Sequence, residues 1–291
     1  MKFRHVGSGY QHSRVVSMVT APHPPAPRDD RPTHVADLLR LLTREPGRPR
    51  LTWYGDDGER VELSGAVLEN WVNKTTNLLV VEFDAGPGTR VVLDLPTHWR
   101  TVVWALAAWR VGATVVLAPT DDDGTPGVGT TRPDVVVTTR PGRWAGTRAE
   151  LVAVTLPALA RRFDGDLPPG AIDAASAVMT YGDQLAWVPA VDLRAPAVET
   201  AAGTLLQHAE LVRSDAGGRV LLESPGPEAR GDQATAVLLA TLGTWSAGGS
   251  VVLLSAAAGD ALAASPDRTR RLVDGEGVTH VPERLRAGGT P

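Results

Sequence analysis

Three adjacent carboxylates, Asp121-Asp122-Asp123, form the densest group of chemistry-bearing side chains in this 291-residue sequence, and glycines follow them. Carboxylate oxygens bind calcium and magnesium, but three adjacent loop residues cannot all face one ion. No histidine or further glutamate supports them, so we interpret them as a solvated loop at the rim of a sheet and predict no metal site. Gly127-Val128-Gly129, in the same loop, is too short for a dinucleotide fingerprint, and no Lys-Ser or Lys-Thr follows to make a phosphate loop.

Other catalytic arrangements are also missing from the sequence. It contains no nucleophile elbow with a Ser/His/Asp order, no His-x-x-x-His and no supported pair of spaced carboxylates. It contains no cysteine, which excludes disulfides, thiolate chemistry and cysteine-ligated metals. We therefore predict no catalytic residue from the motifs alone.

Composition limits the class of protein. Hydrophobic residues make up 43% of the sequence, but no apolar run reaches the length of about 18 residues that a membrane span needs. The formal net charge of −4 argues against a nucleic-acid partner, which would show as a basic face. Together with the absence of cysteine, this predicts a soluble globular protein of the cytoplasm, with no membrane span.

The elements that must position any site are clearest between Leu51 and Leu117. The sequence pattern predicts a hairpin at 53–61 around the Gly55-Asp56-Asp57-Gly58 turn, because Asp-Gly supplies the positive φ of a tight turn. Ser64 is the expected N-cap of an amphipathic helix. A strand at 90–95, a helix ending near Gly112 and a strand at 114–118 then make a parallel unit, so the sequence predicts an α/β protein.

The same patterns extend over the rest of the chain. Thr33 is the expected cap of a helix at 34–44, and the eight tryptophans are expected mostly in the core. Further strands are predicted at 134–139, 151–156, 185–188, 219–223 and 250–254, a helical turn at 159–163, and helices at 232–245 and 267–272. We divide the chain into a disordered tail at 1–31, a first α/β subdomain at 32–190 and a second, incomplete one at 191–291. The tail shows no signal peptide, and translation could start at Met1 or at Met18.

The order of these motifs resembles the N-terminal part of the AMP-binding, adenylate-forming superfamily, which includes acyl-CoA synthetases and the adenylation domains of peptide synthetases. The resemblance runs, with gaps, from about residue 33 to about residue 285, and the composition suggests a short member of actinobacterial type. It implies a three-layer fold of mostly parallel sheets flanked by helices. The matching words are Leu51-Thr52-Trp53, Asn73, Gly88-Thr89-Arg90-Val91, Pro96-Thr97-His98 and Val111-Gly112-Ala113.

The resemblance also assigns a nucleotide loop. In the family, a loop of small residues ending in Pro-Lys-Gly surrounds the ATP phosphates, with a helix and a histidine downstream. It corresponds here to residues 194–208, so the resemblance implies nucleotide contacts from Thr200, Gly203, Thr204 and His208. The loop itself departs from the pattern, because residues 196–199 (Pro-Ala-Val-Glu) replace hydroxyl residues and glycines, and Ala202 replaces the lysine.

That departure decides the expected function. Losing one preorganised donor to a developing charge costs roughly 3–4 kcal/mol, and several are lost here. The family's aromatic-Gly-x-Thr-Glu motif, ribose-binding Asp and small C-terminal domain with the catalytic lysine are also missing from this sequence. We predict a truncated, degenerate homologue that is inactive alone and acts as a binding or assembly module, as a homodimer or with a protein partner. The alternative is a residual ATP or acyl-adenylate binder, or a weak ATP- and magnesium-dependent acid–AMP ligase completed by another chain.

Overall fold

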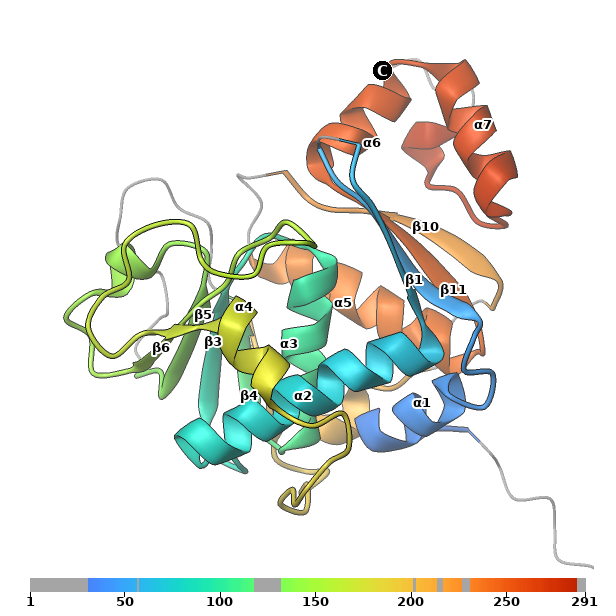
Figure 1. Cartoon of the computed structure of the whole chain (residues 1–291). Helices are drawn as coiled ribbons and strands as arrows, with labels where there is room; N and C mark the ends of the chain where they lie inside the picture. Colours follow the sequence, from blue (N-terminus) through green and yellow to red (C-terminus); the bar gives the residue numbers. More distant parts are fainter. Residues whose placement is uncertain are drawn as a thin grey trace, which may run out of the picture. The chain divides into compact units, whose positions relative to one another are not determined.

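A computed structural model describes residues 31–56, 58–117, 132–200, 203–213, 217–226 and 231–286 (Figure 1). Residues 1–30 of the tail predicted at 1–31, the acidic residues 121–123 and the glycine motif at 127–129 lie outside the described residues.

The described residues form helices and strands in an α/β order. The α-helices are α1 (Val35–Leu42), α2 (Gly65–Phe83), α3 (Trp99–Arg110), α4 (Ala174–Ala177), α5 (Gly231–Ser246), α6 (Ala256–Ala263) and α7 (Pro266–Glu276). The strands are β1 (Pro49–Tyr54), β2 (Arg60–Ser64), β3 (Arg90–Asp94), β4 (Thr114–Leu117), β5 (Val135–Thr138), β6 (Glu150–Ala153), β7 (Ile172–Asp173), β8 (Pro196–Glu199), β9 (Leu205–Gln207), β10 (Arg219–Glu223) and β11 (Ser250–Leu254).

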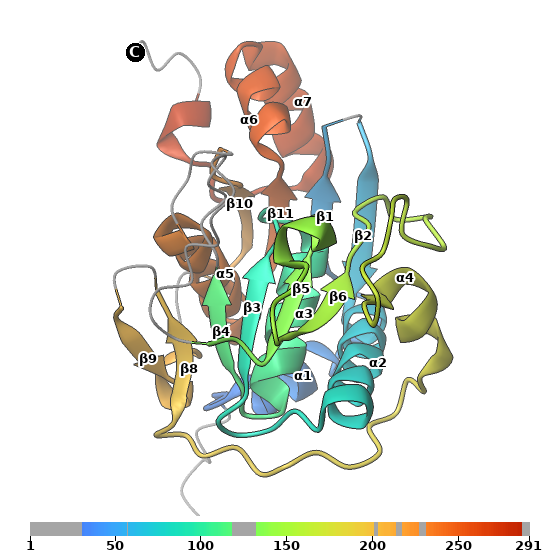
Figure 2. The ribbon, with the colours of Figure 1, turned by 90° about the vertical axis from the view of Figure 1, so that its left-hand side faces the viewer.

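The strands form two mostly parallel sheets. The larger has the order β7-β6-β5-β3-β4-β8-β9, and only β8 and β9 pair antiparallel (Figure 2). The smaller has the order β10-β11-β1-β2, in which β1 pairs parallel with β11 and antiparallel with β2. The predicted α/β fold class with parallel sheets is therefore confirmed.

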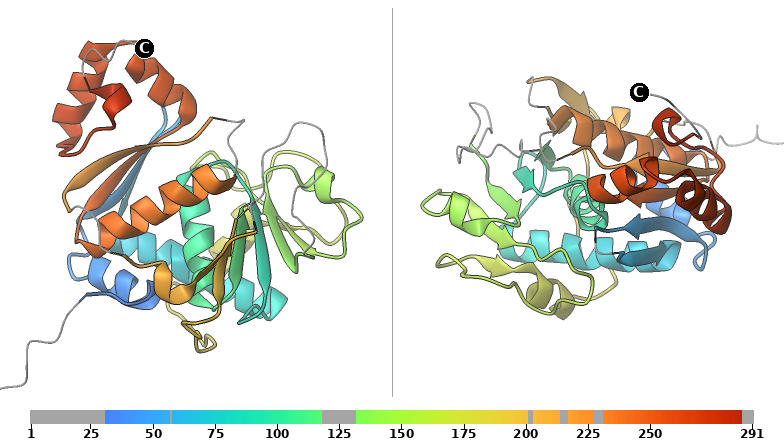
Figure 3. Two further views of the ribbon diagram at one scale, coloured as in Figure 1. Left: turned by 180° about the vertical axis from the view of Figure 1, so that it is seen from behind. Right: turned by 90° about the horizontal axis from the view of Figure 1, so that it is seen from above.

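A layer of helices lies between the two sheets. Helices α3 and α5 contact β4 of the larger sheet, while α2 and α5 also contact strands of the smaller one. Helix α2 lies at the front in Figure 1 and α5 at the front in the left-hand view of Figure 3. The main core fills this layer, and α6 packs on the other face of the smaller sheet around Val252, Leu254 and Leu262.

Local sequence signals explain where several elements begin and end. The Ser64 side chain accepts a hydrogen bond from the Val67 amide and caps α2 as predicted. Gly112, with φ of 81°, follows α3, where few other residues adopt this conformation without strain. The predicted hairpin is formed by β1 and β2, with Trp53 opposite Val61.

Four local predictions were wrong. The N-cap of α1 is His34, whose side chain accepts from the Asp37 amide, rather than Thr33. Residues 159–163 form no helix and 185–188 no strand. Both Leu159 and Trp187 are exposed, although Val188 packs against the core. The helix expected after His208 is only a 3₁₀ turn, His208–Glu210.

The two sheets do not correspond to the chain segments before and after residue 190, where the sequence analysis placed a subdomain boundary. Strands β8 and β9, after that point, complete the larger sheet, while β1 and β2, from the start of the chain, belong to the smaller one. The division into subdomains at 32–190 and 191–291 stays a prediction. Within the described ranges, no helix combines the length and the apolar character that crossing a membrane requires.

A close approach between two helices predicts the effect of one substitution. A Cβ added at Gly65, the first residue of α2, would lie 2.4 Å from the carbonyl oxygen of Leu42. We expect Gly65→Ala to lower the free energy of unfolding by about 1–3 kcal/mol, measured by urea denaturation.

The matched control is Gly275→Ala in α7, where an added Cβ meets nothing within 4 Å. Alanine favours a helix over glycine by about 0.5–1 kcal/mol, so this variant should be as stable as the wild type or slightly more stable. Equal stability of the wild type and Gly65→Ala would contradict the close approach of α1 and α2.

Candidate functional site

A cavity of about 900 Å³ opens between the two sheets at the carboxyl ends of their strands. Ligands of α/β proteins bind at this edge, because the loops that follow parallel strands meet there. We call it the inter-sheet cavity. Its wall comes from the hairpin tip (Gly55, Asp56, Gly58 and Glu59), from the segments that follow β3, β6, β10 and β11 (95–98, 156–157, 224–226 and 255–257) and from the start of α5.

The wall of the inter-sheet cavity is mainly apolar with a few polar groups. Trp53, Leu95 and Leu156 supply apolar surface, and Ser224 and Ser255 supply hydroxyl groups. The Ser224 hydroxyl donates to the Thr97 carbonyl at 2.8 Å, which links the ends of the two sheets. The Ser255 hydroxyl accepts from the Ala258 amide at 3.1 Å and caps α6. Such a mixture of apolar wall and few polar groups is typical of small-molecule sites.

His98 is the only histidine in the lining among the residues that the structure describes. It is the N-cap of α3, and its Nδ1 accepts a hydrogen bond from the Arg100 amide at 3.1 Å. Its ring meets the Trp53 ring edge to face at a centroid distance of 4.5 Å. Burial, helped by the positive charge of Arg100, lowers the pKa of His98 to about 3. The imidazole is therefore neutral at physiological pH, with its proton on Nε2.

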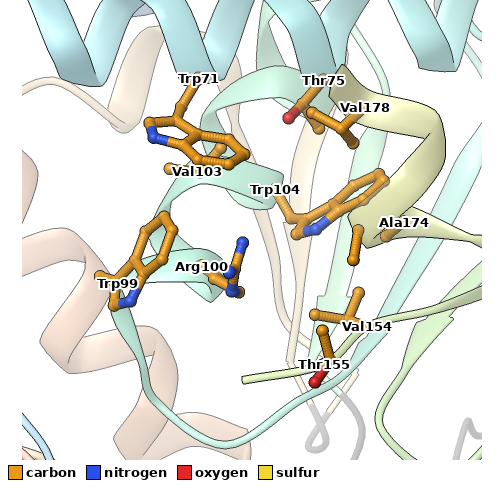
Figure 4. A pocket seen from close by; sticks show the side chains of 11 residues that line it. Trp71, Thr75, Trp99, Arg100, Val103, Trp104, Val154, Thr155, Ala174 and Val178 are labelled. Carbon is orange, nitrogen blue, oxygen red and sulfur yellow. The ribbon is translucent and has the colours of Figure 1, made fainter. Parts of the chain in front are cut away.

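Arg100 lies behind one wall of the inter-sheet cavity, among the side chains that line a smaller neighbouring void (Figure 4). Its guanidinium lies 4.3 Å from the ring centroid of Trp99 and 5.5 Å from that of Trp71. It donates to the carbonyls of Leu156 at 3.2 Å and Pro157 at 3.1 Å. Burial lowers the pKa of Arg100 to about 10, so the side chain stays charged. A smaller void of about 20 Å³ beside it has room for about one water molecule.

Most of the residues assigned to a nucleotide loop belong to the β8–β9 hairpin and its turn. The Thr200 amide donates to the Thr204 carbonyl at 3.0 Å, and the Gly203 amide to the Thr200 carbonyl at 2.8 Å. Gly203 has φ of 79°, as such a tight turn requires. Two amides that could have faced a phosphate are therefore used within the turn, and none of these three residues lines the inter-sheet cavity.

His208 lies at the other end of this hairpin. Because β9 runs antiparallel to β8, Thr200 and Gly203 lie at the carboxyl edge of the sheet, and His208 follows β9 at the amino edge. His208 is 2% exposed, and burial lowers its pKa despite a hydrogen bond with the Gly112 backbone. The structure thus brings Thr200, Gly203 and Thr204 together but not His208.

The wall of the inter-sheet cavity contains residues that the sequence reasoning did not select. Thr97 and His98 were interpreted only as the turn before a helix, and Ser224 and Ser255 were not singled out. The signal was their position, since each follows directly or closely the end of an apolar parallel strand. Within the described ranges, no group of three or more His, Asp or Glu could hold a metal ion.

Comparison with known proteins finds one relative that aligns with part of this chain. No protein-family model matches the chain. A Mycobacterium tuberculosis (H37Rv) protein that carries only a numbered family name is 38% identical over 153 residues, which cover 52% of this chain and 60% of that protein. The match thus spans less than two thirds of the relative.

Two solved structures are similar in fold. The Brucella canis acyl-CoA synthetase matches 85% of this chain with a TM-score of 0.60 at 19% identity, over 46% of its own length. A fatty acyl-adenylate ligase from L. pneumophila, solved with acyl adenylate and pyrophosphate, matches 86% with a TM-score of 0.55 at 12% identity, over 44% of its own length. This chain therefore has the fold of the N-terminal portion of acyl-CoA synthetases, as its sequence motifs predicted, and spans less than half of their length.

Proposed function

We propose that this chain is a ligand-binding module that does not adenylate on its own, with the inter-sheet cavity as its binding site. The observation that carries the proposal is the pairing of that open cavity with a closed hairpin where the resembled enzymes have a phosphate loop. The cavity of about 900 Å³ lies within the range of about 300–1,000 Å³ that is usual for small-molecule sites.

The β8–β9 hairpin does not fit ATP. Pro196 has no amide hydrogen, and the amides of Thr200 and Gly203 are already bonded within the turn. Glu199 forms an ion pair with Arg90 at 2.5 Å, so the charge of Arg90 is already paired. A phosphate needs several free amides or cations around it, and a magnesium ion needs oxygen ligands besides. We therefore expect ATP and magnesium to bind weakly or not at all.

Calorimetric titration tests both halves of this proposal. We expect no heat from magnesium-ATP at millimolar concentration, and saturable binding of an apolar ligand such as octanamide. Ala234→Leu in α5, which narrows the inter-sheet cavity, should weaken that binding at least tenfold. Ala236→Leu on the exposed side of the same helix should leave it unchanged.

Two other results would each contradict one part of the proposal, either the absence of ATP binding or the location of the apolar ligand. Micromolar binding of magnesium-ATP would support a residual adenylate-binding role or a ligase completed by another chain. Equal effects of the two leucine variants would show that the apolar ligand binds outside the inter-sheet cavity.

Assembly is a second candidate function, supported by large apolar side chains on the surface. Leu159, Met179 and Trp187 are 94%, 58% and 66% exposed. If they mediate a homodimer or bind a protein partner, the wild type should sediment as an assembly, and Trp187→Ala should shift it toward the monomer. Sedimentation of the wild type as a monomer at about 100 µM would exclude the homodimer.

A further inference from the structure

The charged residues that line the inter-sheet cavity are all acidic. Among the described residues they are Asp56, Glu59 and Asp260, and no lysine or arginine lines the wall. Arg284 pairs with Asp260 at 2.8 Å and also bonds Glu223. One arginine between two carboxylates leaves the net charge of this group of three residues negative. Arg100 lies behind the wall, where it is held by backbone carbonyls. An anionic ligand would find no free cation here.

Helix ends supply the only opposing positive potential in the described wall. Helices α3, α5 and α6 begin at the inter-sheet cavity, and each helix N-terminus is equivalent to roughly half a positive charge. The side chains of His98 and Ser255 already accept one amide each at α3 and α6. The first turn of α5 carries Asp232. The partial positive charges of these helix N-termini are already partly used by capping side chains, so they do not compensate the full negative charges of the carboxylates.

His98 offers a neutral hydrogen-bond donor instead. Its Nδ1 is occupied as an acceptor, so the neutral ring carries its hydrogen on Nε2. Nε2 has no partner among the described residues and is not among the fully occluded polar atoms. It can therefore donate to an oxygen atom of a ligand in the inter-sheet cavity.

Two polar atoms in the same wall have no hydrogen-bond partner. They are Thr97 Oγ1 and Trp53 Nε1, on side chains that are 6% and 4% exposed. Leaving a buried polar group unsatisfied costs about 1–3 kcal/mol. Both side chains belong to residues that line the inter-sheet cavity, as His98 does.

We infer that the inter-sheet cavity selects an uncharged ligand, an apolar molecule whose head group is a carboxamide or ester carbonyl, over a carboxylate or an adenylate. The carbonyl oxygen accepts from His98 Nε2, while the apolar body lies against Trp53, Leu95 and Leu156. This inference rests on the proposed ligand-binding function of the same cavity.

Octanamide and octanoate provide a matched test, because they differ at the head group and not in the apolar chain. We expect octanamide to bind about tenfold more tightly at pH 8, which is the size of one charge repulsion across about 6 Å of partly wet protein. Glu59→Gln keeps an oxygen for the hydrogen bond from the Ala158 amide and should narrow the difference. Asp183→Asn removes a charge that does not line the cavity, and should leave the difference unchanged.

A second variant tests the donor. His98→Asn keeps a side chain that can cap α3 but removes the imidazole, so it should weaken octanamide more than octanoate; its unfolding midpoint confirms that it folds. Octanoate binding as tightly as octanamide would overturn the selection of uncharged ligands and leave the binding function standing. No binding of either ligand would overturn the proposed function, and this inference with it.

Discussion

Replacing Trp245 by alanine is expected to lower the free energy of unfolding by about 3–5 kcal/mol. The side chain is fully buried in the core between the two sheets. Its Nε1 donates to the Arg50 carbonyl at 2.8 Å, which ties α5 to β1. Alanine would leave a cavity and remove the partner of that carbonyl. Urea denaturation followed by far-ultraviolet circular dichroism measures the loss.

Val81→Ala is the control, because it shortens an apolar side chain at a position that is 65% exposed. We expect its stability to stay within about 0.5 kcal/mol of the wild type. If both variants lost the same stability, the packing of α5 between the sheets would be contradicted.

Replacing Glu276 by alanine is expected to cause the second largest loss in the free energy of unfolding. Its side chain is 9% exposed at the end of α7. It accepts from Tyr54 Oη at 2.5 Å, Arg60 Nε at 2.9 Å and Arg219 Nη2 at 2.5 Å. Glu276→Ala would leave Arg219, 15% exposed, without its charge partner, so we expect a loss of about 3 kcal/mol.

Glu62→Ala provides the comparison, since it removes the more exposed carboxylate that also pairs with Arg60. An exposed ion pair contributes about 0.2–1 kcal/mol. A loss after Glu276→Ala no larger than that after Glu62→Ala would show that α7 is not held by this carboxylate.

The same group predicts a dependence on pH. Burial alone would raise the pKa of Glu276, but hydrogen bonds from Arg60, Tyr54 and Arg219 outweigh it and lower the pKa from 4.5 to about 2. The carboxylate therefore contributes its full stabilisation above pH 4.5 and loses it as the pH falls toward 2. The difference in stability between the wild type and Glu276→Gln should shrink over that range. A difference that stays constant would contradict the lowered pKa.

The fold was predictable where local patterns and tertiary packing agree. Apolar strands such as 90–95 and 250–254 were predicted within one residue, because parallel strands buried on both faces are nearly continuous in apolar residues. The segment 185–188 has the same apolar character but forms no strand, since none of the strands in the described ranges pairs with it. The pattern of apolar residues in a segment does not show whether another strand will lie beside it.

The site was less predictable than the fold. The resemblance directed attention to residues 194–208, and the local sequence does not show that Thr200 and His208 lie at opposite ends of a short hairpin. Among the described residues, the inter-sheet cavity is built from six segments spread from Trp53 to Asp260, and their meeting depends on the order of strands in two sheets. The only local signal was the position of Thr97, His98, Ser224 and Ser255 directly or closely after strand ends.

The pairing of β1 with β11 affects how the chain folds during synthesis. Arg50 and Gly248, 198 positions apart, are hydrogen-bonded across this junction. At about 5–20 residues per second, a ribosome needs roughly 10–40 s to reach β11 after making β1. Over that time the inner edge of β1 presents unpaired amides and carbonyls, and such an edge recruits other strands. Nascent chains that end before residue 250 should therefore aggregate or bind chaperones, and slow refolding from urea should follow from the same long loop.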